Sequence, residues 1–455
     1  MIQITLDSQG WPTRTFLPSQ LIRTAPPQGG GADLTEGNLV KVTSPRMRRL
    51  RAAGAVLAAA AVLGSGLTAC ASDDSSSDTT GATVELSANP ATGPAIKLGF
   101  ITPEGGAVSL PEVRQAGEAA VKYLNENGGG IAGHKIDLVV CKEQEEPASA
   151  TKCANQMVEQ KVAAVVSPFT STGAVILPIL SGANIPYISM APVSQAEMVS
   201  PMSFMLSAGT PGTLMAMATQ AAKDGVKKFA VIIGDTGDAA ASVKALGEPM
   251  FKRAGVEFDV ITVPTSIADP TPNITAAINA NKPDAINILG DSRQCITALK
   301  ALKTVAPDMK KYLISTCFDQ QVVEAVGVDT IAGSTAISTV NLDDDADESV
   351  KIYRSVMAQY APEADARGIG YLGYQVVMAM QGIGNKLPAA EVSSADFTKA
   401  LREATDVPIP AAPGLTFTCN GKAMPQLPSL CSKAALVSKI SSEGKLVDSV
   451  VVNKD

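Results

Sequence analysis

Over most of the chain, short apolar runs rich in valine and isoleucine alternate with longer stretches in which apolar residues recur every three to four positions. The short runs predict buried strands, and the longer stretches predict amphipathic helices. The first predicted strands are residues 96–101, 135–140, 162–166 and 186–189. The helices predicted between them are residues 111–127, 148–160 and 172–183. This alternation predicts a parallel sheet with right-handed helical crossovers.

A second series of strands and helices follows in the same order. Its predicted strands are residues 228–233, 257–263, 284–289 and 311–315. Its predicted helices are residues 213–223, 239–254, 271–280 and 292–305. After Ser334, a strand and two helices over residues 347–360 and 367–385 indicate that the chain returns to the first series. Because the whole region exceeds one comfortable hydrophobic core, we expect two α/β lobes.

The expected fold is α/β, with two Rossmann-like lobes whose parallel sheets are joined by a hinge of several crossovers. Residues 94–208 and 334–415 should form the first lobe. Residues 209–333 and 416–455 should form the second. Two lobes on such a hinge can close over a cleft between them.

The chain also carries the pattern of an export signal. Arg48, Arg49 and Arg51 precede a small, apolar stretch over residues 52–69, which ends in Leu-Thr-Ala before Cys70. A basic region, an apolar region and small residues at a cleavage point are typical of such signals. The ending resembles the bacterial lipobox, in which the cysteine receives diacylglycerol. The alternative is a transmembrane helix, but the stretch is of about minimal spanning length and lacks aromatic anchors.

Residues 47–69 are therefore predicted to be a lipoprotein signal peptide, and the polar residues 70–93 a flexible, lipid-anchored tether. Export signals stand at the start of a chain, so residues 1–46 are predicted to be a leader without function, with Met47 as the true initiator. The expected location is the bacterial cell envelope, at the outer face of the cytoplasmic membrane, with Cys70 as the anchor.

The charge of the mature chain limits its partners. Without residues 1–69, 30 Lys and Arg stand against 41 Asp and Glu, a net charge of −11. An acidic surface of this kind argues against nucleic acid and anionic lipid as partners. We therefore expect contact with the membrane through the lipid anchor only.

Six cysteines remain besides Cys70, and in an exported protein an even number favours disulfides. They fall into three local pairs: Cys141 with Cys153, Cys295 with Cys317, and Cys419 with Cys431. In the chain-entropy view, each closure stabilises the fold by about 3 kcal/mol. A metal site is the rival interpretation, but it would lack closely spaced cysteines and could recruit only one histidine. We expect structural disulfides and no metal.

Several segments, in order, resemble a known family. Residues 96–101 read Ile-Lys-Leu-Gly-Phe-Ile, and residues 125–135, 165–172 and 185–189 continue the resemblance. Together they are similar to branched-chain amino acid-binding proteins, the type I periplasmic solute-binding subunits of ABC importers. The resemblance implies a small-molecule ligand bound between the lobes and an ABC permease as partner. We expect a monomer without a cofactor.

The resemblance also implies ligand-binding residues in the first lobe. Thr170, Ser171 and Thr172 lie between a predicted strand and helix, where hydroxyls and free backbone N–H groups suit a ligand carboxylate. An ordinary helix cap is the alternative interpretation of these residues. Pro192, Val193 and Ser194 match the family's second carboxylate-contacting segment, so we expect Pro192 and Ser194 at the ligand.

In the second lobe, loops after strand ends should bring Asp238, Asp291 and Asp319 to the cleft. The family places an acid near Asp319 to pair with the ligand's ammonium group. Leucine-specific members often present tyrosines in the loops occupied here by residues 236–239 and by Asp291-Ser292, and both aromatics are absent. The expected ligand is therefore amino acid-like or another small carboxylate.

An envelope hydrolase and a ligand-sensing receptor are the two alternative functions. An envelope hydrolase needs an activated nucleophile or a metal, and His134 is the only histidine available. We therefore expect no catalytic residues and no enzyme. A ligand-sensing receptor on the same fold is the other alternative, which the sequence does not separate from transport.

Overall fold

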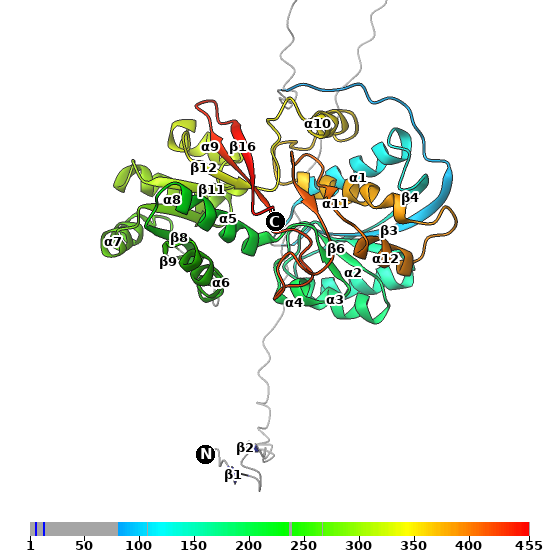
Figure 1. Ribbon diagram of the computed structural model, residues 1–455, viewed down its shortest axis with the longest axis horizontal. Helices are drawn as coiled ribbons and strands as arrows, with labels where there is room; N and C mark the ends of the chain where they lie inside the picture. The colour runs from blue at the N-terminus through cyan, green and yellow to red at the C-terminus, as the bar shows by residue number, and fades with distance from the viewer. Residues whose placement is uncertain are drawn as a thin grey trace, which may run out of the picture. The chain divides into compact units, whose positions relative to one another are not determined.

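The computed structural model describes residues 5–6, 12–13, 81–106, 108–235, 239–265 and 267–454 (Figure 1). The chain divides into two units, Met1–Asp73 and Asp74–Asp455. In the first unit, β1 (Thr5–Leu6) pairs antiparallel with β2 (Pro12–Thr13). The predicted signal peptide, residues 47–69, and the predicted anchor Cys70 lie outside the described residues.

The first sheet of the second unit has five parallel strands in the order β4-β3-β5-β6-β7. Its strands are β3 (Gly93–Pro103), β4 (His134–Glu143), β5 (Ala164–Val166), β6 (Tyr187–Ser189) and β7 (Ser203–Met205). The connecting helices are α1 (Pro111–Glu126), α2 (Pro147–Glu159), α3 (Gly173–Gly182) and α4 (Gln195–Val199). Every residue of the three short strands is buried, as parallel strands covered by helices on both faces require.

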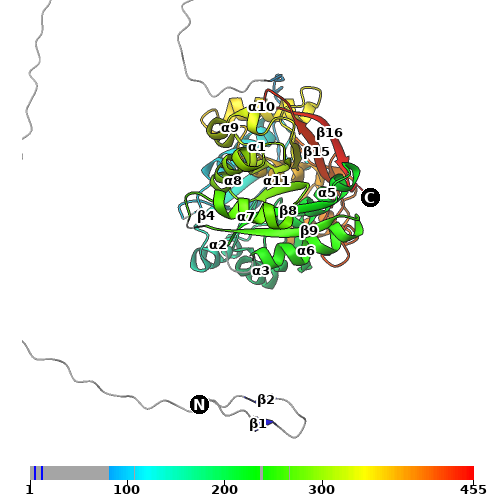
Figure 2. The same ribbon diagram turned by 90° about the vertical axis from the view of Figure 1, so that its left-hand side faces the viewer.

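The second sheet has seven strands in the order β16-β15-β12-β11-β10-β8-β9. They are β8 (Lys228–Asp235), β9 (Glu257–Pro264), β10 (Ala285–Leu289), β11 (Lys310–Ile314), β12 (Thr335–Ser338), β15 (Ala435–Ile440) and β16 (Leu446–Val452). Its helices are α5 (Gly209–Lys223), α6 (Ala239–Arg253), α7 (Thr271–Asn281), α8 (Ser292–Val305) and α9 (Gln320–Val326), with the short turns η1 (Ser315–Cys317) and η2 (Val328–Thr330). Figure 2 shows this lobe face on, with β9 at the sheet edge beside α6 and α7.

The C-terminal part returns to the first lobe before it ends in the second sheet. It contains α10 (Glu348–Tyr360), α11 (Tyr371–Gly382), η3 (Gly384–Lys386), α12 (Ser394–Arg402), β13 (Val407–Pro408) and β14 (Thr416–Phe417). Helices α10 and α11 pack against α1, and their buried side chains belong to the first-lobe core. Two lobes with predominantly parallel sheets confirm the predicted fold class.

The structure corrects both later lobe boundaries. Strand β12 pairs with β11, so the chain leaves the second sheet after Ser338 rather than at residue 334. Cys431 donates its N–H to the carbonyl of Met205 at 2.8 Å, so the segment just before β15 lies on the first sheet although it was assigned to the second lobe. Strands β15 and β16 are antiparallel, because the five residues 441–445 between them are too few for a parallel crossover.

The predicted tether is also shorter than residues 70–93. Residues 82–91 lie against the first lobe through hydrogen bonds along their backbone, and we call them the docked segment. The nearly buried guanidinium of Arg354 donates to the carbonyl of Ala82 at 3.0 Å and pairs with Asp345. The Ser355 hydroxyl bonds both backbone groups of Val84, at 2.8 and 2.7 Å. The sequence missed this contact because the segment has no apolar periodicity.

All three predicted disulfides are present: Cys141–Cys153, Cys295–Cys317 and Cys419–Cys431, with Cα–Cα distances of 5.6, 5.1 and 4.2 Å. Disulfide formation in local pairs is thereby confirmed. Within the described residues, none of the helices combines the length and apolar character needed to cross a bilayer.

Helices α1 and α11 approach each other at two glycines, and this contact lies at the centre of the first-lobe core. A Cβ atom on Gly373 would lie 1.9 Å from the carbonyl oxygen of Val113 and 3.1 Å from the backbone nitrogen of Gly117. A Cβ on Gly117 would in turn meet the ring of Phe100 at 2.6 Å. The two backbones are therefore in direct contact, which only glycine permits here.

Candidate ligand-binding site

The predicted ligand-binding residues that the structure describes follow the carboxyl ends of parallel strands, where ligands bind in open α/β sheets. In the first lobe, the loops after β5 and β6 carry Ser171 and Ser194, and the loop after β4 carries Glu145, which was not predicted. In the second lobe, the loops after β10 and β11 carry Asp291 and Asp319.

A carboxylate of the chain itself occupies the donors at the start of α3. The Ser171 N–H donates to Glu145 Oε2 at 2.7 Å, and the Thr170 hydroxyl donates to Glu145 Oε1 at 2.9 Å. The Ser171 hydroxyl also donates to Glu145 Oε2. Thr170 is buried. Its hydroxyl oxygen lies 2.9 Å from the Thr172 hydroxyl and accepts the Thr172 N–H at 3.0 Å. The three predicted residues thus form one donor group, and Glu145 is a site residue that the sequence analysis missed.

A second carboxyl group lies beneath Glu145. Glu143, at the end of β4, is fully buried, with its Oε2 3.4 Å from the Thr170 hydroxyl and its Oε1 accepting the Glu146 N–H at 3.0 Å. Burial, and after it the neighbouring carboxyl group of Glu145, raises the pKa of Glu143. Two acids two residues apart at the end of a strand were the available sequence signal, because residues i and i+2 of a strand point to the same face.

A carboxylate of the chain also takes the hydrogen-bond donors of the second predicted segment of the first lobe. The buried carboxylate of Glu197 accepts the N–H groups of Val193 and Ser194 at 3.0 and 2.7 Å, the Ser194 hydroxyl at 2.9 Å and the Tyr187 hydroxyl at 3.0 Å. Ser194 and Glu197 form the capping box of α4, which uses these donors structurally. Pro192 is buried and has no N–H to offer.

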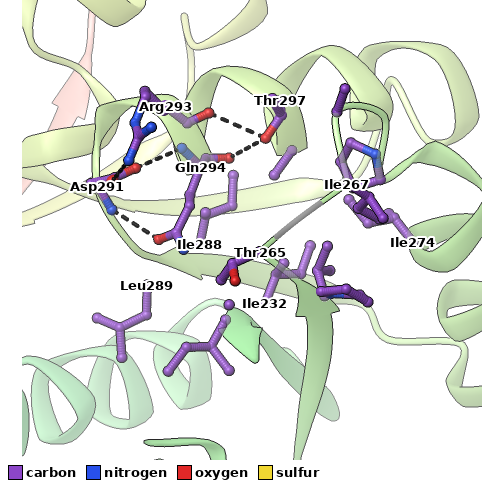
Figure 3. A pocket seen from close by; sticks show the side chains of 17 residues that line it. Ile232, Thr265, Ile267, Ile274, Ile288, Leu289, Asp291, Arg293, Gln294 and Thr297 are labelled. Carbon is purple, nitrogen blue, oxygen red and sulfur yellow. Dashed lines mark hydrogen bonds and ion pairs between the residues drawn. The ribbon is translucent and has the colours of Figure 1, made fainter. Parts of the chain in front are cut away.

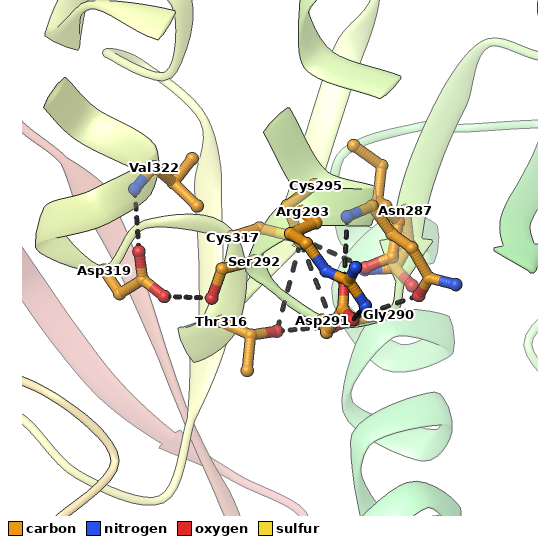
Figure 4. The surroundings of a disulfide bond; sticks show 12 residues. Asn287, Gly290, Asp291, Ser292, Arg293, Cys295, Thr316, Cys317, Asp319 and Val322 are labelled. Atoms are coloured by element: carbon orange, nitrogen blue, oxygen red, sulfur yellow. Dashed lines mark hydrogen bonds and ion pairs between the residues drawn. A yellow bond between two sulfur atoms is a disulfide. The ribbon is translucent and has the colours of Figure 1, made fainter. Parts of the chain in front are cut away.

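In the second lobe, a disulfide holds two of the predicted acids at neighbouring positions (Figure 4). Cys295–Cys317 ties the first turn of α8 to the turn after β11. The Ser292 hydroxyl donates to Asp319 Oδ2 at 2.5 Å, while Asp319 Oδ1 accepts the Val322 N–H at 2.8 Å. Asp291 caps α8 by accepting the Gln294 N–H at 2.8 Å. The third predicted acid, Asp238, lies outside the described residues.

Next to Asp291 the second lobe contains a cavity of about 490 Å³ (Figure 3). Apolar side chains from β8, β9, β10 and α7 form most of its wall: Ile232, Val263, Ile274, Ile288 and Leu289. Asp291, Arg293, Gln294 and Thr297 supply polar groups from α8 and its cap. The Gln294 amide oxygen accepts the Asp291 N–H at 3.1 Å, which folds this side chain over Gly290 and towards Gly234. Sequence patterns did not predict the cavity, because each lining residue reads as ordinary core.

The two lobes are in contact near the carboxyl end of β11. The Ser315 hydroxyl in η1 lies 3.4 Å from the Tyr371 hydroxyl at the start of α11. Tyr371 is buried, and its phenol pKa is raised mainly by that burial. This contact brings the turn that precedes Asp319 to the surface of the first lobe.

No cluster of three metal-binding side chains occurs among the residues that the structure describes. His134 is buried, and its two ring nitrogens bond the carbonyls of Pro94 at 2.8 Å and Pro388 at 2.9 Å. Both nitrogens are therefore committed to structural contacts. Donor groups beside an apolar cavity wall are suited to holding a small polar molecule.

Comparison with known proteins agrees with this arrangement. The sequence profile of the family described as periplasmic binding protein matches residues 95–429. No curated protein sequence matches the chain.

Solved structures resemble the fold over most of its length. A leucine-binding protein from Thermotoga maritima has a TM-score of 0.62 and 17% identity, covering 79% of this chain and 99% of its own. A branched-chain amino acid transporter substrate-binding protein from Streptococcus pneumoniae, in complex with isoleucine, has a TM-score of 0.61 and 19% identity, covering 79% and 99%. A solute-binding protein of an ABC transporter from Rhodopseudomonas palustris, in complex with 3,4-dihydroxybenzoic acid, has a TM-score of 0.61 and 18% identity, covering 79% and 98%.

Proposed function

We infer the function from one premise: this chain belongs to the periplasmic binding protein family, and its two lobes have the type I fold. Members of the family are solute-binding proteins rather than enzymes. We propose that the chain captures a small amino acid-like or carboxylate solute in the cleft between its lobes and delivers it to an ABC importer. Two of the similar structures were solved with isoleucine and with 3,4-dihydroxybenzoic acid, and both of those molecules carry a carboxylate.

The donor group of Thr170 and Ser171 is the observation that carries this proposal. Its N–H and hydroxyl groups already hold a carboxylate, that of Glu145, at 2.7–2.9 Å. Charge-assisted bonds of this kind are stronger than neutral ones. The helix α3, ten residues long, begins directly behind the group and favours negative charge there. The chemistry of this place therefore suits a ligand carboxylate.

Closure of the lobes would complete the site. A ligand held by the donor group of the first lobe would meet Asp319 and the apolar cavity wall of the second. Contacts made only in the closed form shift the population towards it by their own free energy. The closed form would then dock on the permease. The neighbouring contact between Ser315 and Tyr371 supports an approach of the lobes at this edge.

We further propose that Cys70 carries a lipid anchor. Cys70→Ala should abolish labelling by a radioactive fatty acid and release the protein from the membrane fraction. Membrane fractionation of intact cells, with Cys419→Ala as a control that keeps the lipobox, measures the effect. Labelling that persists in Cys70→Ala would overturn the anchor.

Ligand capture is tested first by a thermal-shift screen of amino acids and small carboxylates on the wild-type protein. For a solute that binds, Ser171→Ala should weaken affinity about ten- to a hundred-fold in a Glu145→Ala background, where the chain's own carboxylate no longer takes the same donor, because a hydrogen bond to a charged group contributes about 1.5–3 kcal/mol. Thr151→Ala, on the exposed face of α2, removes a hydroxyl that bonds only its own helix and serves as the control. Equal affinity with and without the Ser171 hydroxyl in the Glu145→Ala background, measured by calorimetry, would remove the first-lobe site from the proposal.

A further inference from the structure

Two carboxylates of the chain fill the donors of the first-lobe site, but they are held very differently. Glu197 is fully buried within α4 and receives four hydrogen bonds. Glu145 is partly exposed in the loop between β4 and α2, and its donors come from Thr170 and the exposed Ser171. Glu197 is therefore part of the core, whereas the Glu145 side chain can leave its position without disturbing buried packing.

We propose that Glu145 is an intramolecular competitor, whose carboxylate occupies the ligand-carboxylate position in the free protein and is displaced by the ligand. This inference rests on the proposed function and names the residue that sets its selectivity. The exchange replaces one carboxylate by another on the same donors, so the number of charge-assisted hydrogen bonds is unchanged.

The surroundings of Glu145 favour its release. The Thr170 hydroxyl has one proton, and the carboxylates of Glu145 and Glu143 lie 2.9 and 3.4 Å from it. These two carboxyl groups are therefore close together, with Glu143 buried and unable to move away, and they repel each other when both are ionised. Swinging the Glu145 carboxylate into solvent relieves this repulsion, and the carboxylate of the ligand then accepts the bond from the buried Thr170 hydroxyl in its place.

The same charges predict the class of ligand. A simple carboxylate in this position would restore the repulsion against Glu143. A ligand with a cationic group beside its carboxylate would instead offer the released Glu145 a partner of opposite charge. The site should therefore prefer zwitterions of the amino acid type over the corresponding simple acids.

Acetate and glycine test this proposal without knowledge of the natural ligand, because they differ by one ammonium group. If the position is free in about 1–10% of wild-type molecules, Glu145→Ala should bind acetate about ten- to a hundred-fold more tightly than wild type. Glu146→Ala removes an exposed acid from the same loop and should bind acetate like wild type. Affinities are measured by calorimetry at constant ionic strength, with sodium chloride as the reference salt.

Glycine supplies the second readout. Its preference over acetate should be largest in wild type and should fall in Glu145→Ala, because the displaced partner of the ammonium group is gone. The loss of glycine affinity caused by Ser171→Ala should also be larger in the Glu145→Ala background. In the wild-type background the substitution removes a donor from Glu145 as well as from the ligand, so the two effects offset each other. Should Glu145→Ala not fold, Glu145→Gln keeps the side-chain length and removes the charge, and the same shifts are expected at smaller size.

Equal acetate affinity in wild type and Glu145→Ala, or no acetate binding by either, would overturn the competitor. Unchanged glycine preference would overturn the predicted zwitterion selectivity. Both failures are distinguishable from failure of the proposed function, because a solute found in the screen could still bind with an affinity that depends on Ser171.

Discussion

Gly373→Ala should destabilise the protein by about 3 kcal/mol, because the added methyl group has no space between α1 and α11. Its Cβ would lie 1.9 Å from the Val113 carbonyl oxygen, a backbone atom that cannot rotate away. The two helices would have to separate, which would disturb the largest apolar cluster of the first lobe. Chemical denaturation of the mature protein, followed by circular dichroism, measures the loss.

Gly182→Ala is the matched control for this prediction. Gly182 ends α3, lies in ordinary helical backbone, and has no atom within 4 Å of the position that a Cβ would take. Alanine should therefore leave stability unchanged or raise it by up to about 1 kcal/mol. If Gly373→Ala were as stable as Gly182→Ala, the close contact between α1 and α11 would be wrong.

Loss of the Cys295–Cys317 disulfide should reduce both stability and ligand affinity. Replacing both cysteines by alanine reopens a loop of 22 residues, which should cost about 3 kcal/mol of folding free energy. The bridge also holds the first turn of α8 against the turn after β11, and these carry Asp291 and Asp319. Releasing these segments should lower the affinity for an ammonium-bearing ligand, because binding must then supply the free energy that orders the loop.

The Cys419–Cys431 pair separates these two effects. It closes a loop of 12 residues on the first lobe, beside the C-terminal end of α4 and not in the loops that carry Asp291 and Asp319. Its double alanine variant should lose stability by a similar amount, about 3 kcal/mol, but keep its ligand affinity. Affinity that falls equally in both double variants, at a temperature where both are folded, would contradict a local role for Cys295–Cys317.

The alternation of strands and helices was predictable because each element has its own apolar period. All eight strands predicted in the two series have counterparts, from β3 at Gly93–Pro103 to β11 at Lys310–Ile314. The crossings between lobes were not predicted at the correct residues. The sequence of β12 is compatible with either sheet. Only its pairing with β11 in the structure assigns it to the second.

The candidate site divides in the same way. Thr170 and Ser171 were recognisable because hydroxyl residues between a strand and a helix have a local meaning. Glu145 was not, because its role depends on a contact across 26 positions of sequence with Ser171. The apolar cavity beside Asp291 depends likewise on four separate elements that meet at one edge of the sheet.

The docked segment, residues 82–91, determines which lobe a lipid anchor at Cys70 would hold. If Cys70 carries the lipid, a free tether to residue 94 would allow the domain to stand up to about 80 Å from the bilayer, whereas a tether that ends at Gly81 allows about 40 Å. Because the segment is bonded to Arg354 and Ser355 of the first lobe, pull from the membrane acts on that lobe alone. The second lobe would then move relative to an anchored first lobe, and the proposed permease would meet a protein of restricted height and orientation.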